Sequence, residues 1–419
     1  MRLTLRLLCL STLIFIAGCQ SLAPVHAPTS ASRKIPLLLI SIDGFRADYL
    51  DRGYTPTLSM LADHGVHSVG MQPSYPTLTF PNHYTLVTGR YPDHHGVVDN
   101  SMLVPDLGKF KLSNREAVAD GRWWDQAEPI WVSADRQGLK TATMYWPGSE
   151  ASIHGYRPDH WRKYAEEEVS SNGRVDQILQ WLDLPSPERP RFMTLYFDAV
   201  DTAGHFDGPG SAKTNEAIAE VDAALAHLVA GLRERGLFDR INIIVVADHG
   251  MADTPANQRI FLDDLIPQND AMIVSTGAIA GIIPSPGHES DVESVLLRTR
   301  DHMQCWKKSE IPAHLHYGSN ERVPPIICAA DTGWLMTRNA KTALVQGKPI
   351  LGEHGFDNGD VAMRALFLAH GPAFREHVVL PVFANVDVYP LMTHLLGIQA
   401  QPNDGRLAEI EDALVPAEL

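Results

Sequence analysis

The sequence predicts an α/β fold, built as a doubly wound, mostly parallel sheet with helices on both faces. Two observations carry this prediction: short, mostly apolar runs alternate with segments of helical periodicity, and acidic residues directly follow the apolar runs. Short continuous apolar runs are typical of parallel strands that are buried on both faces. Alternating strands and helices are the pattern from which sheets of this kind are assembled.

Four strands and two helices can be placed from these patterns. The strands are predicted at residues 36–42, 193–197, 241–246 and 363–369. The first helix is expected to begin at Thr55-Pro56, with Thr55 as the N-cap and Pro56 in the first turn, and to end at Gly65. A second helix is predicted within 217–232, where apolar residues recur at helical spacing.

The chain divides into a leader, a tether and one large domain. Residues 1–19 are predicted to be a lipoprotein signal peptide, 20–34 a flexible tether rich in Ala, Pro, Ser and Thr, and 35–419 the folded domain. Within this domain, residues 254–348 are richer in Pro and Gly and fit the strand–helix alternation less well. We interpret them as a smaller α+β segment inserted into the same core.

The leader indicates export. Basic Arg2 and Arg6 precede an apolar run that is too short to span a bilayer comfortably. The run ends in Ala17-Gly18-Cys19, which resembles the lipobox of bacterial lipoproteins and implies lipidation of Cys19; a secretory signal that happens to contain a cysteine is the alternative. The following Gln20 resembles the signal for sorting to the outer membrane, so we expect a lipid-anchored protein at the outer membrane or facing the periplasm of a Gram-negative bacterium.

The cysteine content predicts a disulfide, and the net charge restricts the classes of binding partner. Cys305 and Cys328 are the cysteines left after the leader, and in an oxidising compartment they predict one disulfide, with two buried free thiols as the alternative. The formal net charge of −15 argues against duplex nucleic acid as a partner. A small anionic substrate remains possible, because divalent cations can reverse the sign of the local field.

Potential metal ligands lie directly after predicted strands, where ligand sites form in open α/β sheets. Three aspartates and three histidines occur in such motifs: Asp43, Asp201, Asp248, His205, His249 and His354. Each residue alone is a weak signal, since such residues are often helix caps or solvated loop residues. Together they suit two cations that bind oxygen and imidazole ligands.

A hydroxyl nucleophile is available in Pro76-Thr77-Leu78-Thr79-Phe80-Pro81-Asn82-His83. Pro81 and Asn82 look like the opening of a helix, so Thr79 would lie where backbone N–H groups and the helix dipole favour an anion. Ser74, Thr77 and Thr85 are alternatives that the residues alone do not exclude. His83, His94 and His95 match no metal motif and are expected to be structural or exposed.

These motifs together resemble the nucleotide pyrophosphatase/phosphodiesterase family of the alkaline phosphatase superfamily, in its bacterial form, from about residue 36 to residue 407. The resemblance implies an alkaline-phosphatase-like catalytic domain that binds two Zn2+ per chain. Asp201, His205 and His354 would hold one zinc. Asp43, Asp248, His249 and the hydroxyl of Thr79 would hold the other. Manganese or iron could substitute at such sites.

The resemblance also implies the reaction and its pocket. Thr79, a threonine directly before Phe-Pro-Asn-His, would attack phosphorus and form a phospho-threonine ester that water then hydrolyses. Asn100 would hold a phosphate oxygen, and the aromatic rings of Phe80 and Tyr196 would stack a base. Leu112 and Tyr164 are further substrate-binding candidates.

The leading prediction is therefore a monomeric phosphodiesterase that hydrolyses nucleotide phosphodiesters or pyrophosphates and releases nucleoside monophosphates. The same chemistry on lipid or choline phosphodiesters is the alternative, since aromatic residues also suit a choline cation. A monoesterase is disfavoured, because no arginine is evidently placed beside Thr79, although the sequence does not place Arg46 and Arg90. A non-catalytic binding lipoprotein would be expected to have lost a metal ligand or Thr79, and none is lost.

Overall fold

The computed structural model describes residues 35–164 and 169–416 of the 419-residue chain. The predicted signal peptide, the predicted tether and Cys19 therefore lie outside the described residues. Among the residues that are described, no helix is both long enough and apolar enough to cross a bilayer.

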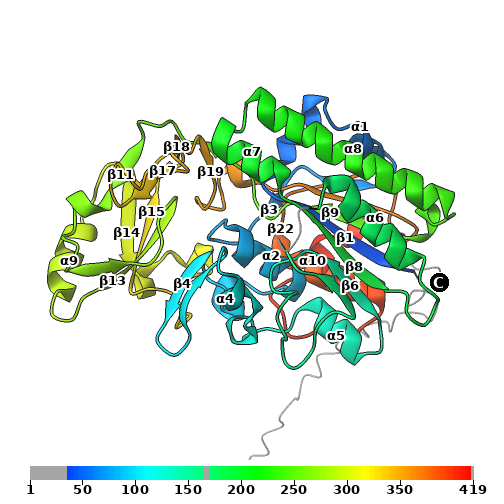
Figure 1. The fold of residues 1–419 in the computed structure, drawn as a ribbon, viewed down its shortest axis with the longest axis horizontal. Coiled ribbons are helices and arrows are strands. Elements are labelled where there is room, and N and C mark those ends of the chain that lie inside the picture. The colour runs from blue at the N-terminus through cyan, green and yellow to red at the C-terminus, as the bar shows by residue number, and fades with distance from the viewer. Residues whose placement is uncertain (1–34, 165–168, 417–419) are drawn as a thin grey trace, which may run out of the picture.

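An eight-stranded sheet forms the centre of the fold (Figure 1). Its strands, from one edge to the other, are β21 (Val378–Leu380), β2 (Val66–Ser68), β20 (Phe367–His370), β9 (Asn242–Val246), β1 (Leu37–Ile42), β8 (Phe192–Phe197), β6 (Thr141–Met144) and β7 (His160–Arg162). All neighbouring pairs are parallel except the two that involve β20. The prediction of a mostly parallel sheet is confirmed.

Helices cover both faces of this sheet, as predicted. One layer contains α1 (Pro56–Asp63), α6 (Ser171–Leu182), α7 (Ala199–Asp207) and α8 (Ala212–Glu234), which pack against one another. The other layer contains α2 (Thr79–Thr88), α5 (Ile130–Arg136) and α10 (Val388–Leu396). The central strands β1, β8 and β9 are buried along their whole length, which explains why their sequences are uninterrupted apolar runs.

Two local predictions need correction. The strand expected at residues 363–369 begins only at Phe367, because Val361–Met363 form a 3-10 turn. The hydroxyl of Thr55 does not cap α1 but donates to the carbonyl oxygen of Leu50. The cap comes instead from the carboxylate of Asp222 on α8, which accepts the N–H groups of Thr57 (3.0 Å) and Leu58 (2.8 Å).

Residues 254–348 carry a second, antiparallel sheet beside the central one (Figure 1). Its strand order is β12 (Ala271–Ile273), β13 (Ile279–Pro284), β15 (Ile326–Ala330) and β14 (Met303–Lys307), and α9 (Glu289–Leu296) lies between β13 and β14 in the chain. This sheet has a hydrophobic cluster of its own. Cys305 on β14 lies opposite Cys328 on β15, and the two form a disulfide.

Short paired segments complete the fold around the two sheets. They are β3 (Met71–Gln72) with β22 (Phe383–Ala384), β4 (Ser101–Val104) with β5 (Gly108–Lys111), β10 (Ala252–Asp253) with β19 (Gly352–Glu353), β11 (Arg259–Phe261) with β16 (Leu335–Thr337), and β17 (Leu344–Val345) with β18 (Lys348–Pro349). Two short helices, α3 (Pro92–His95) and α4 (Arg115–Ala119), follow α2 in the chain.

Candidate active site

The first group of candidate ligands comes from the ends of two neighbouring strands. Asp43 follows β1, whereas Asp248 and His249 follow β9. Because β1 and β9 are parallel neighbours, with Ser41 opposite Val246, these side chains emerge side by side. One ligand atom from each of the three lies within 4.8 Å of the other two, and all three residues are buried.

The second group is built on a helix. Asp201 and His205 lie four residues apart on α7, so both side chains project from the same face of the helix. His354 follows β19 and completes the group, with ligand atoms again within 4.8 Å of one another. The rings of His249 and His354 stack at a centroid distance of 3.5 Å, which joins the two groups into one site.

Hydrogen bonds orient all three histidines in the same way. In each ring Nδ1 lies against a backbone carbonyl oxygen, which leaves Nε2 facing the carboxylates: His205 to Gly352 at 2.8 Å, His249 to Gly250 at 2.8 Å, and His354 to Thr77 at 2.9 Å. A proton held on Nδ1 leaves the lone pair of Nε2 free to bind a metal. This is the arrangement usual for metal-binding histidines.

Unsatisfied oxygens show that the site fits cations. One carboxylate oxygen each of Asp43, Asp201 and Asp248 is buried without a hydrogen-bond donor among the described residues. Nε2 of His249 lies 3.0 Å from Oδ2 of Asp248, and with the ring proton on Nδ1 this contact pairs two acceptors. A cation bound between them would satisfy both atoms, so the residues present suit two divalent metal ions.

The electrostatics of the protein alone agree with this. Burial, together with the charges of Asp248 and Asp201, raises the pKa of Asp43 well above its usual value. Burial opposes the charged form of His205, but the carboxylates of Asp201 and Glu353 outweigh it and raise the pKa of His205 to about 9. The site therefore concentrates negative charge that must be neutralised by protons or by metal ions.

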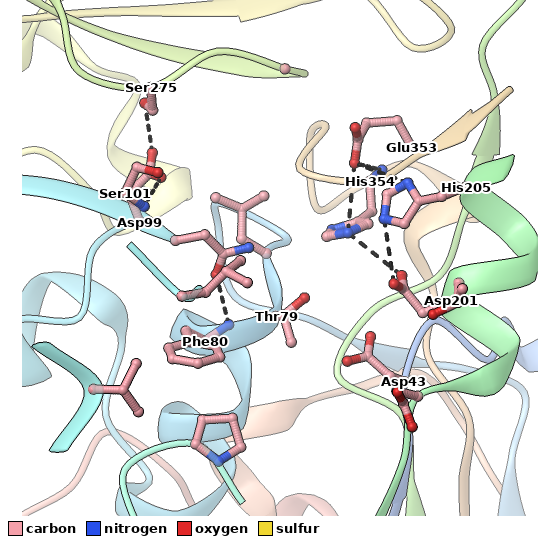
Figure 2. Close-up of a pocket in the computed structure, with 18 of the residues that line it drawn as sticks. Asp43, Thr79, Phe80, Asp99, Ser101, Asp201, His205, Ser275, Glu353 and His354 are labelled. Atoms are coloured by element: carbon pink, nitrogen blue, oxygen red, sulfur yellow. Dashed lines mark hydrogen bonds and ion pairs between the residues drawn. The ribbon is translucent and has the colours of Figure 1, made fainter. Parts of the chain in front are cut away.

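Thr79 is the hydroxyl that faces this cluster (Figure 2). It is the first residue of α2, and its Oγ1 lies 3.3 Å from Nε2 of His249. The three alternative hydroxyls are engaged elsewhere: Ser74 with Asn385, Thr77 with the carbonyl oxygen of Phe356, and Thr85 with His95. Of the four, only Thr79 lines the cavity described next.

The start of α2 offers fewer free N–H groups than the sequence suggested. The N–H of Phe80 donates to Oδ1 of Asn100 at 2.9 Å, and Pro81 has no N–H. The bond to Phe80 also fixes the orientation of the Asn100 amide. Since Oδ1 is engaged, the Nδ2 group of Asn100 is the one available as a donor in the cavity.

A cavity of about 490 Å³ opens beside Thr79 and contains all five predicted substrate-binding residues. Phe80 and Tyr196 are buried in its wall, Tyr164 is half-buried and Leu112 is exposed. Tyr196 has a further contact that the sequence did not predict, because its hydroxyl donates to Oδ2 of Asp43 at 2.5 Å. The hydroxyl of Tyr164 donates to Asp198 at 2.9 Å.

Other residues of the site were missed in the sequence. His83 is buried, with Nδ1 2.8 Å from the carbonyl oxygen of Thr79 and 3.3 Å from Oδ2 of Asp248. Glu353 lies 3.6 Å from both His205 and His354. Glu150 lines the cavity beside Tyr164. Two local signals were available: Glu353 is next to His354 in the chain, and His83 lies four residues after Thr79 on the same helix. The position of Glu150 depends on tertiary contacts.

Comparison with known proteins identifies the family of this chain. Residues 37–357 match the family model of type I phosphodiesterase / nucleotide pyrophosphatase. The chain is 39% identical to an uncharacterized pyrophosphatase/phosphodiesterase of Schizosaccharomyces pombe over 88% of its own length and 78% of that protein. It is 41% identical to ectonucleotide pyrophosphatase/phosphodiesterase family member 3 of Rattus norvegicus over 88% of its own length, but spans only 43% of that protein.

A third relative is the bis(5'-adenosyl)-triphosphatase enpp4 of Xenopus laevis, which is 36% identical over 94% of this chain and 85% of that protein. Among solved structures, an inactive variant of murine ectonucleotide pyrophosphatase/phosphodiesterase 5 in complex with AMP matches with a TM-score of 0.86, at 34% identity over 91% of this chain and 100% of the other. These matches confirm the alkaline-phosphatase-like fold. The chain is therefore an enzyme of the type I phosphodiesterase / nucleotide pyrophosphatase family.

Proposed function

We propose that this enzyme is a two-zinc phosphodiesterase that hydrolyses nucleotide phosphodiester or pyrophosphate bonds and releases nucleoside monophosphates. One observation carries the proposal. The hydroxyl of Thr79 lies at the junction of a six-residue ligand cluster and a cavity walled by aromatic rings. Relatives named for pyrophosphatase and phosphodiesterase activity, and the AMP complex of a structural neighbour, support it.

The two ligand groups define the metal sites in this proposal. Asp201, His205 and His354 would hold one zinc, and Asp43, Asp248 and His249 the other, with Thr79 beside it. When bound, zinc lowers the pKa of a nearby hydroxyl or water and neutralises charge that develops on phosphate oxygens.

The protein's own groups perform the remaining tasks. Oγ1 of Thr79 gives up its proton to solvent and forms an ester with phosphorus, while the bond between phosphorus and the leaving oxygen breaks and the leaving group takes up a proton from solvent as needed. The Nδ2 group of Asn100 donates to a non-bridging phosphate oxygen, and the contact between its Oδ1 and the N–H of Phe80 keeps that donor in place. Water then hydrolyses the threonine ester, which regenerates Thr79 and releases the nucleoside monophosphate.

The cavity favours a diester over a monoester. A dianionic monoester is usually held by an arginine clamp. Arg46 is instead paired with Asp48 and bonded to the carbonyl oxygen of Met251, and Arg90 donates to the carbonyl oxygen of Gln126. Among the described residues, Arg115 is the one arginine that lines the cavity, and it is bound to Leu112 and Glu150.

For the base, we propose a slot formed by the rings of Phe80 and Tyr196, with Tyr164 and Leu112 as further lining residues. Stacking would contribute about 1–3 kcal/mol and would accept several bases. Hydrolysis of lipid or choline diesters is the second candidate, because Tyr145 and Trp146 add further aromatic surface to the cavity wall. The non-catalytic lipoprotein is the least favoured interpretation.

We further propose that the protein is bacterial and exported, that Cys19 anchors it to the outer membrane, and that it acts as a monomer. The leader sequence supports export and anchoring. Such an anchor would join the domain near the start of β1, at the end of that strand opposite Asp43.

The test is a comparison of ester substrates. Wild type, Thr79→Ala and chelator-treated enzyme are assayed on the p-nitrophenyl ester of thymidine monophosphate, on p-nitrophenyl phosphate and on a choline phosphodiester. Thr202→Ala, at another threonine that lines the cavity, is the matched control. We expect fast hydrolysis of the nucleotide diester, a loss of at least about 1,000-fold in Thr79→Ala, and recovery of the stripped enzyme with zinc.

Each other result has a distinct meaning. Turnover of the choline ester with a poor nucleotide rate would keep Thr79 as the nucleophile but change the substrate class. Comparable rates in Thr79→Ala and wild type would refute the role of Thr79. No turnover of any ester by zinc-loaded protein would support the binding lipoprotein.

A further inference from the structure

A third group of ligand atoms lies far from the active site. His64 ends α1, and Glu376 and His377 directly precede β21. One ligand atom from each of these three side chains lies within 4.8 Å of the other two, the same separation that brings together each active-site group. All three residues are exposed.

The topology places this group at the end of the sheet where the parallel strands start, opposite the end that carries the cavity. β2 and β21 are parallel to each other and run in the same direction as β1. His64 and His377 precede these strands, whereas Asp43 follows β1. The group is therefore separate from the catalytic cluster.

The three side chains have no other polar partners. None of them makes a hydrogen bond or an ion pair with any other residue in the described part of the chain, and the rings of His64 and His377 lie 6.0 Å apart. Some other surface histidines pair with an aspartate: His94 with Asp404, His227 with Asp176, His288 with Asp270, and His302 with Asp331. In the described part of the chain, the exposed His314, His316 and His394 form no such pair, but none of them belongs to a group of three potential ligands.

A neighbouring buried group supports a ligand at this end of the sheet. His370, at the end of β20, is 9% exposed, and its Nδ1 has no hydrogen-bond partner among the described residues. It lies within electrostatic range of His64. His64 and His377 on the surface and His370 below it thus all have ring nitrogens without a hydrogen-bond partner among the described residues.

We propose that His64, Glu376 and His377 bind a divalent transition-metal ion, with zinc as the expected metal. Two imidazoles and one carboxylate are an established ligand set for zinc, and Asp201, His205 and His354 offer the same set in the active site. Because the side chains are exposed, water would fill the remaining coordination positions.

The experiment compares zinc contents at equilibrium. Purified holoenzyme, a His64→Ala/His377→Ala variant and a His227→Ala control are dialysed against the same buffer containing micromolar free zinc. Bound zinc per chain is then measured by mass spectrometry, and the thermal unfolding midpoint and the diesterase rate are recorded. We expect the double variant to bind one zinc fewer than wild type and the control, with an unchanged rate and folding.

The result does not depend on the number of active-site metals, because it is a difference between two proteins. An Asp201→Ala/His205→Ala variant should lose active-site zinc. Adding the substitutions His64→Ala and His377→Ala to this variant should remove one further zinc. Equal zinc content in wild type and a folded double variant would overturn the proposal. If the double variant fails to fold, His377→Ala alone, titrated with zinc, should bind at least tenfold more weakly than wild type, and equal affinity would overturn the proposal.

Discussion

Tyr196 shows how a residue found by resemblance can have a second role. Its ring lies in the wall of the cavity, but its hydroxyl donates to Oδ2 of Asp43 at 2.5 Å. Oδ1 of Asp43 finds no donor in the part of the chain that the structure describes, and it lies 3.4 Å from Nε2 of His249. The hydrogen bond from Tyr196 therefore holds Asp43 with its free oxygen directed at the candidate metal site. Residues that orient metal ligands in this way commonly matter about 10–100-fold for metal affinity or activity.

We accordingly predict that Tyr196→Phe, which keeps the ring and removes the hydroxyl, weakens zinc binding about tenfold and leaves the preference among bases unchanged. Competition between the enzyme and a fluorescent chelator measures the zinc affinity, and the KM for two nucleotide esters measures the base preference. Tyr164→Phe is the matched control, since its hydroxyl contacts Asp198. A raised KM with unchanged zinc affinity would favour base stacking alone.

Glu150 carries an unsatisfied oxygen in the cavity wall. Its Oε1 accepts the N–H of Tyr164 at 2.9 Å and lies 3.4 Å from Arg115, whereas Oε2 is buried without a hydrogen-bond donor among the described residues. A rotation of the side chain toward the cavity would let this oxygen accept a hydrogen bond from the exocyclic amino group of adenine, a group that thymine lacks.

We predict that Glu150→Gln reduces the preference for an adenosine over a thymidine ester by about tenfold, because the gain from satisfying a buried acceptor is about 1–3 kcal/mol. Glutamine keeps an acceptor for Tyr164, so the slot itself should persist. The ratio of kcat/KM for the two p-nitrophenyl esters is the measurement, with the exposed Glu116→Gln as control. An unchanged ratio would show that Glu150 serves only to hold Tyr164.

At the level of single residues, the sequence predicted the candidate metal ligands that directly follow strands. Asp43 and Asp248 could be named because strand ends converge in a parallel sheet, and the family resemblance supplied Thr79 and His354. The bond between Tyr196 and Asp43 joins residues 153 positions apart, and the position of Glu150 depends on how Tyr164 folds back. No spacing in the chain contains that information.

Among the secondary-structure elements, α1 begins where the local sequence predicts it, but its N-terminal cap comes from a residue far away in the chain. Pro56 marks the start of the helix as predicted, but the cap is Asp222, 165 residues away from Thr57. Its buried carboxylate satisfies two N–H groups at once and lies favourably at the positive end of the helix dipole.

We predict that Asp222→Ala lowers the free energy of unfolding by about 1–2 kcal/mol, the usual cost of losing a helix cap. Asp222→Asn retains one acceptor and should lose less. Urea unfolding followed by circular dichroism measures both. An Asp222→Ala protein as stable as wild type would show that water replaces the carboxylate at no cost.

Among the strands, the long buried ones could be predicted from the local sequence, whereas the short ones could not. β1, β8 and β9 lie within a residue of their predicted starts because burial on both faces requires a continuous apolar run. β2, β7 and β21 were not predicted, since each has three residues, which is too few for a periodic signal.

In the whole molecule, the sequence predicted the fold class but neither the strand order nor the way the segment 254–348 meets the central domain. The structure joins them partly through Asp99, beside Asn100 at the cavity. Oδ2 of Asp99 accepts the hydroxyl of Ser275 at 2.9 Å, and Oγ of Ser275 accepts the N–H of Gly281 at 3.0 Å. The contact spans 176 residues and is buried, so no local pattern could reveal it.

This buried contact gives the whole protein a specific pH dependence. Burial raises the pKa of Asp99 to about 6, from 3.8 for an ordinary aspartate. Between about pH 4 and pH 6 the folded protein therefore holds a proton that the unfolded chain has lost. Since the folded state binds more protons, the contribution of Asp99 to the free energy of unfolding falls as pH rises, by up to about 3 kcal/mol.

We predict that Asp99→Asn, which stays neutral, gains stability relative to wild type as pH rises from 4 to 7, by about 2–3 kcal/mol in the difference between the two proteins. Using the difference cancels the pH dependence of the metal ligands, because both proteins carry them. Urea unfolding at four pH values provides the measurement. Ser275→Ala keeps the carboxyl but removes a hydrogen bond that lowers its pKa, so the fall in stability should persist and extend to higher pH than in wild type. Parallel profiles for wild type and Asp99→Asn would show that Asp99 ionises in the folded protein as it does in the unfolded chain.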